Sequence, residues 1–512
     1  MNTEAVYRNI DTLVQYAVFE ELIPESEKWY ATNQILDLLG MESFDCKLQP
    51  SESLIKKFYD DAGSALMEIL DSLCDAAAEN GKIDNLGPYR EIFSTKLMNV
   101  FSLRPQQLVD KFWEEYRNHG EQQAMCFLSD YMTKINYLNS YRLNQDLRWS
   151  FDSKYGRLEI LVSLTKPELD PQAILAAKLA PINHYPFCAL CRENEGYAGR
   201  INAAARATHR VIPLTIRGKK WFLQLSPYKY LDQHCILLTE KHYPMCINRE
   251  KIETLTDFLD MFPSLFLGSN ADLPFVGGSV LAHEHFQGGH HHLPIMSAKV
   301  REVVSVTDEI SVSILNWPLS TICLTSKNKE LFIEQAASII DKWHVYSNAE
   351  QKIDCGSEEN FHNTITPIGW KDPKQGYILC LMLRNNVTTE ERPDGLYHTH
   401  PSRFHIKKEG IGIIDAPGLS IFPPRLKKEF THIAEILLNR TTMEEHPELS
   451  AHFEWVERMK NQYIFTEENV WPILHQEVGD IFVQMLEDCA VFDNTEQGEK
   501  AFLEFVKSCM II

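Results

Sequence analysis

The spacing of apolar residues changes along this chain of 512 residues, and that change constrains its fold class more than any other feature. From residue 1 to roughly 175, apolar residues such as Leu66, Ile69 and Leu73 mostly recur every three or four positions, as they do on one face of a helix. After Pro181 the pattern shifts to short β-type runs bounded by glycine and proline. Helical spacing returns from Leu426 to the C-terminus. We therefore predict an α+β fold with a helical N-terminal extension and a helical C-terminal segment.

The middle of the chain alternates predicted strands with predicted helices. The strands are expected at residues 210–217, 220–226, 234–239, 377–383 and 411–421, and the helices at residues 251–262 and 329–343. His283-Glu284-His285 is echoed by His398-Thr399-His400, which hints at an internal duplication. Since no linker-like tract marks the boundaries, we expect a helical extension over residues 1–175, two sheet-containing halves over 176–300 and 301–430, and a helical segment over 431–512.

The composition excludes several classes of protein. A formal net charge of -21 at pH 7 opposes nonspecific binding to nucleic acid or anionic membrane, although it leaves room for a local basic pocket. No run approaches the ~20 apolar residues of a membrane span, and the N-terminal residues lack the layout of a signal peptide. The 12 cysteines are too dispersed for a disulfide scaffold. We expect a cytoplasmic protein with no nucleic acid or membrane partner.

Five of the chain's 19 histidines lie within the ten residues from His283 to His292. Histidine can act as a nucleophile, a proton carrier or a metal ligand near neutral pH, because its unperturbed pKa is about 6.5. In an extended segment, His283 and His285 share one face, whereas Glu284 points to the other. Two imidazoles would then enter one pocket. The alternative, a solvated histidine-rich loop, applies most to residues 290–292.

Cys188 and Cys191 are the one closely spaced cysteine pair, in a Cys-x-x-Cys sequence. Such a pair can be a redox couple, half of a zinc site or a coincidence, and the helix N-terminus that a redox couple usually needs is not evident here. A structural zinc requires four ligands. His283, together with His242 at the end of a predicted strand, would complete a Cys₂His₂ set.

His285 is the candidate nucleophile. A neutral imidazole can attack phosphorus and form a phosphoramidate that breaks readily, which splits a group transfer into two displacements. Such a site needs donors for the phosphate oxygens. Gln287, Ser279 and the backbone amides around Gly277 and Gly278 can supply them, since glycine lets the backbone approach a ligand closely.

Six segments of the sequence together resemble one family. They are residues 185–197 (YPFCALCRENEGY), 268–279 (GSNADLPFVGGS) with 283–294 (HEHFQGGHHHLP), 383–386 (LRNN), 394–398 (DGLYH) and 423–425 (PPR). The family is the second class of UDP-glucose–hexose-1-phosphate uridylyltransferase, the galactose-1-phosphate uridylyltransferase of the Leloir pathway. The resemblance covers most of residues 180–430, and a helical N-terminal extension is typical of the class. It implies two histidine-triad-like halves.

The resemblance also implies a role for each residue of the histidine motif. The first class of the family carries His-Pro-His-Gly-Gln, in which the second histidine becomes uridylylated and the glutamine contacts phosphate. These positions fall on His285 and Gln287, whereas Glu284 and Phe286 depart from the motif. In the first class, the first histidine binds a metal with a Cys-x-x-Cys pair and one further histidine. The matching zinc ligands here are Cys188, Cys191, His242 and His283.

Further substrate-binding residues are candidates in the matched segments and in the second half. They are Asn270, Arg384, Asn385, Lys407 and Lys408. Arg384 and Asn385 end an apolar run, so a simple turn after a strand is the alternative for them. The two lysines resemble basic residues that would face a hexose phosphate. A solvated surface is the alternative for each lysine.

The reaction that the resemblance implies is a ping-pong transfer. His285 takes UMP from UDP-glucose and releases glucose 1-phosphate, and galactose 1-phosphate then accepts UMP to give UDP-galactose. A homodimer is implied too, as is a second metal at His398 and His400, which resemble a metal-binding pair of the first class. The alternatives are another histidine-triad enzyme, namely a nucleotide phosphorylase or hydrolase, and a noncatalytic zinc-binding protein.

Overall fold

The computed structural model describes residues 3–45, 47, 52–165, 183–278, 280–357 and 359–511. The chain forms two compact units. Unit 1 consists of Met1–Gln145, Pro167–Leu214 and Phe222–Lys229, and unit 2 consists of Asp146–Lys166, Thr215–Trp221 and Tyr230–Ile512. Helices and sheets both build the fold, so the predicted α+β class is confirmed.

Unit 1 is built mainly from helices, as the spacing of its apolar residues predicts. The helices are α1 (Thr3–Phe19), α2 (Lys28–Leu39), α3 (Glu52–Glu79), α4 (Gly87–Asn99), α5 (Pro105–His119), α6 (Glu121–Lys134) and α7 (Ser140–Leu143). α3 buries Leu66, Ile69 and Leu73 on one face, and α1 packs against α3. Among the described residues, no helix combines the length and apolar character that a membrane crossing needs.

A ten-stranded sheet carries the histidine segment. Its strands are β3 (Ile212–Ile216), β4 (Lys219–Leu225), β5 (Cys235–Thr239), β6 (Phe266–Gly268), β7 (His285–Gly289), β8 (Val300–Val306), β9 (Ile310–Leu315), β10 (Thr321–Ser326), β13 (Asn363–Asp372) and β14 (Gly376–Asn385). The strand order is β3-β4-β5-β7-β6-β13-β14-β10-β9-β8. The predicted strands at residues 210–217, 220–226, 234–239 and 377–383 thus become β3, β4, β5 and β14.

The order of the strands repeats, although the repeat does not relate the two histidine pairs that hinted at a duplication. Three successive strands, one helix and two strands in exchanged order make up each half of the sheet, and the halves meet where β6 pairs with β13. β7 and β14 therefore occupy equivalent places. β14 begins with Gly376-Tyr377-Ile378 and has no histidine there, and His398 and His400 follow β14 in a loop. The second histidine pair is therefore not the structural counterpart of the first.

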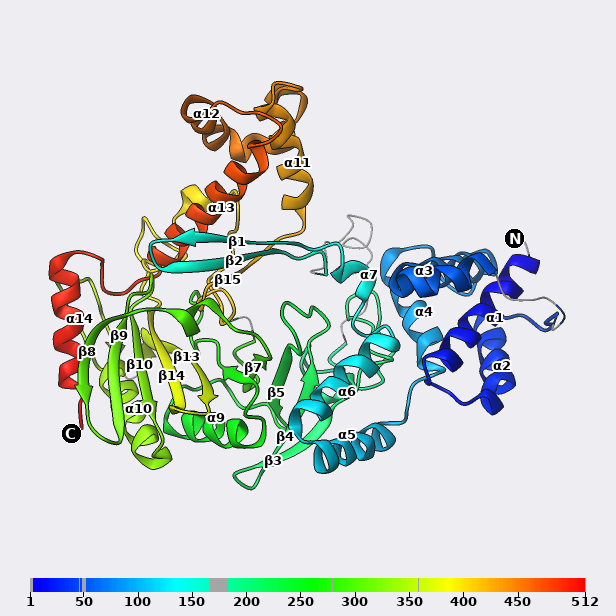
Figure 1. The fold of residues 1–512 in the computed structure, drawn as a ribbon, viewed down its shortest axis with the longest axis horizontal. Coiled ribbons are helices and arrows are strands. Elements are labelled where there is room, and N and C mark those ends of the chain that lie inside the picture. The colour runs from blue at the N-terminus through cyan, green and yellow to red at the C-terminus, as the bar shows by residue number, and fades with distance from the viewer. Residues whose placement is uncertain are drawn as a thin grey trace. The chain divides into compact units, whose positions relative to one another are not determined.

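One helix from each half covers the same face of the sheet (Figure 1). α9 (Arg249–Met261) packs against β6 and β13, and α10 (Lys329–His344) packs against β10, β13 and β14. Both helices begin after an asparagine cap, because the side chains of Asn248 and Asn328 accept a hydrogen bond from the third backbone N–H of the helix. Their bounds agree with the predicted helices at residues 251–262 and 329–343.

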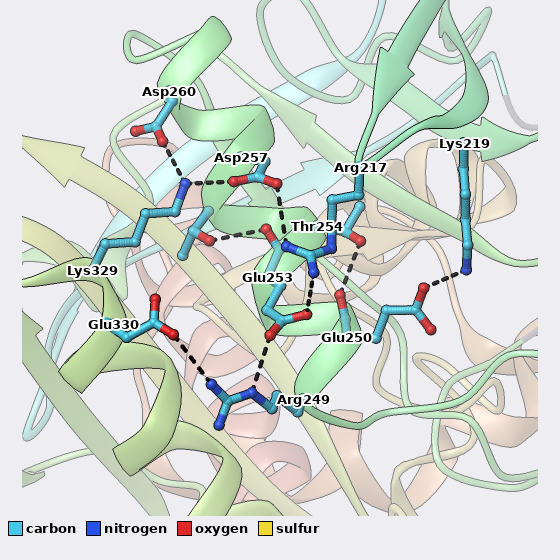
Figure 2. A network of polar contacts seen from close by, with 11 residues as sticks. Arg217, Lys219, Arg249, Glu250, Glu253, Thr254, Asp257, Asp260, Lys329 and Glu330 are labelled. Atoms are coloured by element: carbon cyan, nitrogen blue, oxygen red, sulfur yellow. Dashed lines mark hydrogen bonds and ion pairs between the residues drawn. The ribbon is translucent and has the colours of Figure 1, made fainter.

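Ion pairs connect α9 to the turn between β3 and β4 and to the start of α10 (Figure 2). Arg217 in the turn binds Glu253 at 2.9 Å, and Lys219 at the start of β4 binds Glu250. From α10, Lys329 binds Asp260 at 2.6 Å. The side chains of Lys219 and Glu250 are each 53% exposed, so water screens their attraction.

A smaller, three-stranded sheet and the C-terminal helices complete unit 2. The strands are β1 (Leu147–Ser153), β2 (Gly156–Val162) and β15 (Leu419–Phe422), and the helices are α11 (Arg425–Leu437), α12 (Phe453–Gln462), α13 (Val470–Glu487) and α14 (Glu496–Ser508). A short hairpin pairs β11 (Gly356–Ser357) with β12 (Asn360–Phe361). The sequence did not predict the β1–β2 hairpin, which lies inside the region expected to be helical. The predicted helical C-terminal segment is confirmed.

The prediction of one strand over residues 411–421 is wrong for most of its length, because only its last three residues belong to β15. The carboxylate of Asp415 accepts hydrogen bonds from the backbone N–H groups of Gly412, at 3.2 Å, and Ile421, at 2.9 Å. These bonds fold the apolar segment into turns rather than a ladder. The segment remains buried in the core beside β15.

Trp343 on α10 is expected to contribute strongly to the stability of the core. Its side chain is fully buried, and its indole N–H donates to the carbonyl of Thr364 at 2.8 Å. We expect Trp343→Ala to lower the free energy of unfolding by about 4 kcal/mol, since it leaves a large cavity. Lys219→Ala is the control from the exposed network and should cost less than about 1 kcal/mol. Urea unfolding followed by circular dichroism measures both, and equal losses would contradict the expectation.

Candidate active site

The backbone around His285 is held extended on both sides. β7 pairs with β5 on one edge, where His285 lies opposite Leu238, and with β6 on the other. Just before β7, the N–H of Glu284 donates to the carbonyl of Tyr243 at 2.7 Å. The N–H of Thr239 donates to the carbonyl of Glu284 at 3.2 Å. These bonds fix the segment that carries both histidines.

Each of these histidines has one ring nitrogen bound to a backbone carbonyl. Nδ1 of His285 lies 2.8 Å from the carbonyl oxygen of His283, and Nε2 of His283 lies 2.8 Å from that of Thr239. A carbonyl only accepts, so in each case the ring nitrogen carries the proton. The lone pair of His285 is therefore on Nε2, and that of His283 is on Nδ1. Burial lowers the pKa of His285 to about 4, so its imidazole is neutral at neutral pH.

The two residues that depart from the family motif meet a buried lysine of α9. Nζ of Lys251 is paired with the carboxylate of Glu284 and lies 4.9 Å from the ring centre of Phe286. Glu284 and Phe286 therefore face the same way, as the alternation of an extended chain requires. The side chain of Lys251 is only 2% exposed, and burial lowers its pKa. Spacing alone gave no signal for this residue, because a lysine on an amphipathic helix is normally solvated.

Gln287, two residues beyond His285, is held by a second residue that the sequence analysis missed. Nε2–H of His234 donates to Oε1 of Gln287 at 3.2 Å. This bond directs the amide oxygen of Gln287 to His234 and leaves the amide N–H₂ to act as a donor elsewhere. Burial lowers the pKa of His234 to about 4, so its ring is also neutral. Its position at the start of a predicted strand was the one available signal.

The structure brings the four predicted metal ligands together. One ligand atom from each of Cys188, Cys191, His242 and His283 lies within 4.8 Å of the others. The two sulfurs are 3.4 Å apart, and the rings of His242 and His283 are 4.0 Å apart between centres. Two thiols and two imidazoles are a donor set that suits a tetrahedral metal such as zinc. Without a metal, burial raises the pKa of Cys191 to about 12, and a bound cation would favour its thiolate.

Several candidate substrate residues converge on one loop, residues 410–415. The side-chain oxygen of Asn270 accepts from the N–H of Ile413 at 2.9 Å, and Nη1 of Arg384 donates to the carbonyl of Ile411 at 3.0 Å. Gly277 has a φ of +93°, and a Cβ there would collide with the carbonyl of Ile411. These residues hold the loop in place through buried contacts.

The remaining candidates differ in how accessible they are. Lys407 is buried and bonded to Asp415 at 2.6 Å, whereas Lys408 is exposed. Asn385 bonds within the fold, to the carbonyl of Asp354 at 2.8 Å. A Cβ on Gly278 would lie 2.7 Å from the carbonyl of Ala271, so this glycine allows close packing. Ser279 lies outside the described residues.

The second predicted histidine pair, His398 and His400, does not form a comparable group among the described residues. His398 is buried and His400 is exposed, and neither belongs to a cluster of three or more potential metal ligands in the described part of the chain. The second metal predicted there therefore stays a prediction. Of the three histidines that follow β7, His291 contacts Glu159 at 3.0 Å and His292 contacts Ser297 at 2.7 Å.

Comparison with known proteins assigns the chain to a family. The model of the galactose-1-phosphate uridyl transferase N-terminal domain matches residues 21–244, and that of the C-terminal domain matches residues 257–457. The chain belongs to the galactose-1-phosphate uridylyltransferase family. The galactose-1-phosphate uridylyltransferase of Lactococcus lactis is 38% identical over 508 residues, which cover 98% of this chain and 99% of the relative. The Bacillus subtilis protein of the same name is 36% identical over 508 residues, covering 98% of this chain and 97% of that one.

One solved structure shows a distant likeness to the chain. Yeast Ap4A phosphorylase Apa2 aligns with 65% of this chain and 90% of its own, at 10% sequence identity and a TM-score of 0.32. A likeness at this level carries no argument about the site. The family assignment rests on the matches along the sequence.

The buried ion pair between Lys251 and Glu284 is expected to stabilise the segment that carries His283 and His285. Lys251→Met leaves the Glu284 carboxylate without its partner, so we expect the free energy of unfolding to fall by about 3 kcal/mol. Adding Glu284→Gln removes the stranded charge and should restore part of that loss. The control cycle uses Lys220→Met and Glu240→Gln, an exposed pair at 3.0 Å, whose coupling should stay below about 1 kcal/mol. Additive effects in the Lys251 cycle, measured by urea unfolding, would refute the buried coupling.

Proposed function

We propose that this chain transfers UMP from UDP-glucose to galactose 1-phosphate through a covalent uridylyl group on His285. The products are glucose 1-phosphate and UDP-galactose. The observation that carries the proposal is the buried, neutral imidazole of His285, whose Nδ1–H is bound to the carbonyl of His283. Family membership supports the choice of substrates, since the relatives are named galactose-1-phosphate uridylyltransferases.

In the first half-reaction, Nε2 of His285 attacks the α-phosphorus of UDP-glucose. The Nε2–P bond forms, and the bond from the α-phosphorus to the bridging oxygen breaks, so glucose 1-phosphate leaves with that oxygen. The carbonyl of His283 stabilises the positive charge that develops on the ring, because it accepts from Nδ1–H. No acid is needed at the leaving oxygen, since a sugar phosphate is a good leaving group.

In the second half-reaction, a phosphate oxygen of galactose 1-phosphate attacks the same phosphorus. The Nε2–P bond then breaks and UDP-galactose forms. The amide N–H₂ of Gln287 donates to a nonbridging oxygen in both steps, and His234 holds the amide in that orientation. The two half-reactions together exchange one sugar phosphate for another, so the overall equilibrium lies near balance.

The candidate substrate residues take different roles in this proposal. Asn270, Gly277 and Arg384 shape the substrate site by fixing the loop at residues 410–415, as their contacts with Ile411 and Ile413 support. The backbone around Gly278 and Ser279 provides donors to phosphate. Of the two lysines, Lys408 is the one available to a hexose phosphate, since it is exposed, whereas the charge of Lys407 is neutralised by Asp415. Asn385 supports the fold beside Arg384.

We also propose that zinc binds Cys188, Cys191, His242 and His283 through their clustered ligand atoms. With four protein ligands the site is closed, so the metal would supply structural rigidity and no open coordination position. Nδ1 of His283 is the ligand atom, because Nε2–H donates to Thr239. A fixed His283 in turn fixes the carbonyl that holds His285. The four-part domain division, the cytoplasmic location and the homodimer stay predictions of the sequence analysis.

The covalent intermediate provides the direct test of function. After the whole chain is mixed with UDP-glucose alone, intact-protein mass spectrometry should show one added uridylyl group and an equal amount of released glucose 1-phosphate. His285→Ala should show neither, and galactose 1-phosphate should discharge the wild-type adduct as UDP-galactose. Discharge by water or inorganic phosphate instead would favour a hydrolase or phosphorylase. Absence of any adduct on a folded, metal-loaded chain would reject the transferase proposal.

Loss of the proposed zinc should slow uridylylation through the position of His283. We expect Cys191→Ser to lose one equivalent of zinc and to label His285 at least about tenfold more slowly, as changes that disturb metal-site geometry commonly do. Cys126→Ser is the matched control, because Cys126 is exposed and belongs to no ligand cluster in the described residues. Quenched-flow labelling and atomic absorption give the two readouts. A variant that loses zinc and labels at the wild-type rate would show that the metal does not position His283.

A further inference from the structure

A second cluster of potential metal ligands lies in the C-terminal helical part of unit 2. His432 is on α11, His446 lies between the 3₁₀ helices η5 (Met443–Glu445) and η6 (Pro447–His452), and Glu448 is on η6. One ligand atom from each lies within 4.8 Å of the others. No sequence motif and no part of the proposed reaction uses these residues.

The spacing of the ligand atoms favours a metal over simple ion pairs. Nδ1 of His432 lies 3.3 Å from Oε1 of Glu448, and Nδ1 of His446 lies 3.4 Å from the same oxygen. A charge-assisted hydrogen bond would be about 2.7–2.9 Å long. In a tetrahedral zinc site with bonds of about 2.0–2.2 Å, neighbouring ligand atoms are about 3.3–3.6 Å apart. Both contacts match this separation.

The ring nitrogens of His432 and His446 are also arranged so that Nδ1 of each can bind a cation. Nδ1 of His432 is buried and has no hydrogen-bond partner, an arrangement that is costly for a polar atom unless a ligand binds it. On the other side of the His446 ring, Nε2 lies 3.3 Å from the hydroxyl of Thr441, which donates to Glu445 at 2.6 Å. Thr441 therefore accepts from Nε2–H and directs the lone pair of Nδ1 toward the cluster. Such outer partners typically fix the tautomer of metal-binding histidines.

We propose that His432, His446 and Glu448 bind a zinc ion, or another divalent cation that prefers imidazole, at a site separate from the Cys₂His₂ group. Two imidazoles and one carboxylate leave a coordination position for water, and the side chain of Glu448 is 50% exposed, so the ion can exchange with solvent. The metal joins α11 to the segment of residues 441–448. Its role is to cross-link these two parts of the C-terminal helical region.

The test is zinc binding to the whole chain. Protein freed of metal with a chelator is dialysed against buffered Zn²⁺, and bound zinc is measured by atomic absorption for wild type, His446→Ala and Glu448→Gln. The matched control is His119→Ala, since His119 and Glu115 form a histidine–carboxylate pair at 2.9 Å that belongs to no three-ligand cluster in the described residues. The Cys₂His₂ group is unaltered in every variant, so this readout does not depend on it or on uridylyl transfer.

We expect His446→Ala to bind one equivalent of zinc less than wild type and His119→Ala. Thr441→Val keeps the ligands and loses the outer contact, so it should bind zinc about tenfold more weakly. Circular dichroism establishes that each variant is folded, and Glu448→Gln, at an exposed position, gives the same comparison if His446→Ala does not fold. Equal zinc content in wild type and the folded ligand variants would overturn the proposal and leave the cluster as an ion pair.

Discussion

The hydrogen bond from Nδ1–H of His285 to the carbonyl of His283 is the contact on which the proposed chemistry depends. It assigns the proton to one ring nitrogen and the lone pair to the other, and burial keeps the ring neutral, so the nucleophile needs no base to activate it. The same carbonyl is set by the extended backbone between β5 and β6. The sheet thus positions the nucleophile through main-chain geometry.

Glu284 and Phe286 replace the proline and glycine of the family's first-class motif, and the structure gives a physical account of both. Their side chains face α9 and contact Lys251, on the opposite side of the strand from the imidazoles. An ammonium group this deeply buried is tolerated because the carboxylate pairs with it and the aromatic face lies close by. The contacts with Lys251 thus accommodate both substitutions on the side of β7 that faces α9. They do not require a different arrangement of His283 and His285 on the other side.

Local spacing predicted the elements whose side chains alternate or repeat regularly, and it failed where distant contacts decide the backbone. The strands β3, β4, β5 and β14 and the helices α9 and α10 follow from their apolar periods. Residues 411–418 read as a strand too, yet Asp415 turns them through hydrogen bonds that no pattern reveals. In the site, the histidines and cysteines could be predicted from the sequence because their side chains are typical nucleophiles and metal ligands. The roles of Lys251 and His234 could not be predicted, because these residues act through buried contacts with residues far along the chain.

The repeated strand order has a consequence for how this chain can vary. Each half builds the same frame of five strands and one helix, but only β7 carries a histidine where β14 has Gly376-Tyr377-Ile378. Within the sheet, the two halves pair where β6 meets β13, at two residue pairs, and α9 and α10 pack against each other beside this junction. The first half carries the proposed nucleophile, whereas the second half carries Arg384, which helps to fix the loop at residues 410–415. The start of β14 is therefore the position at which a second reactive histidine could be engineered into the same chain.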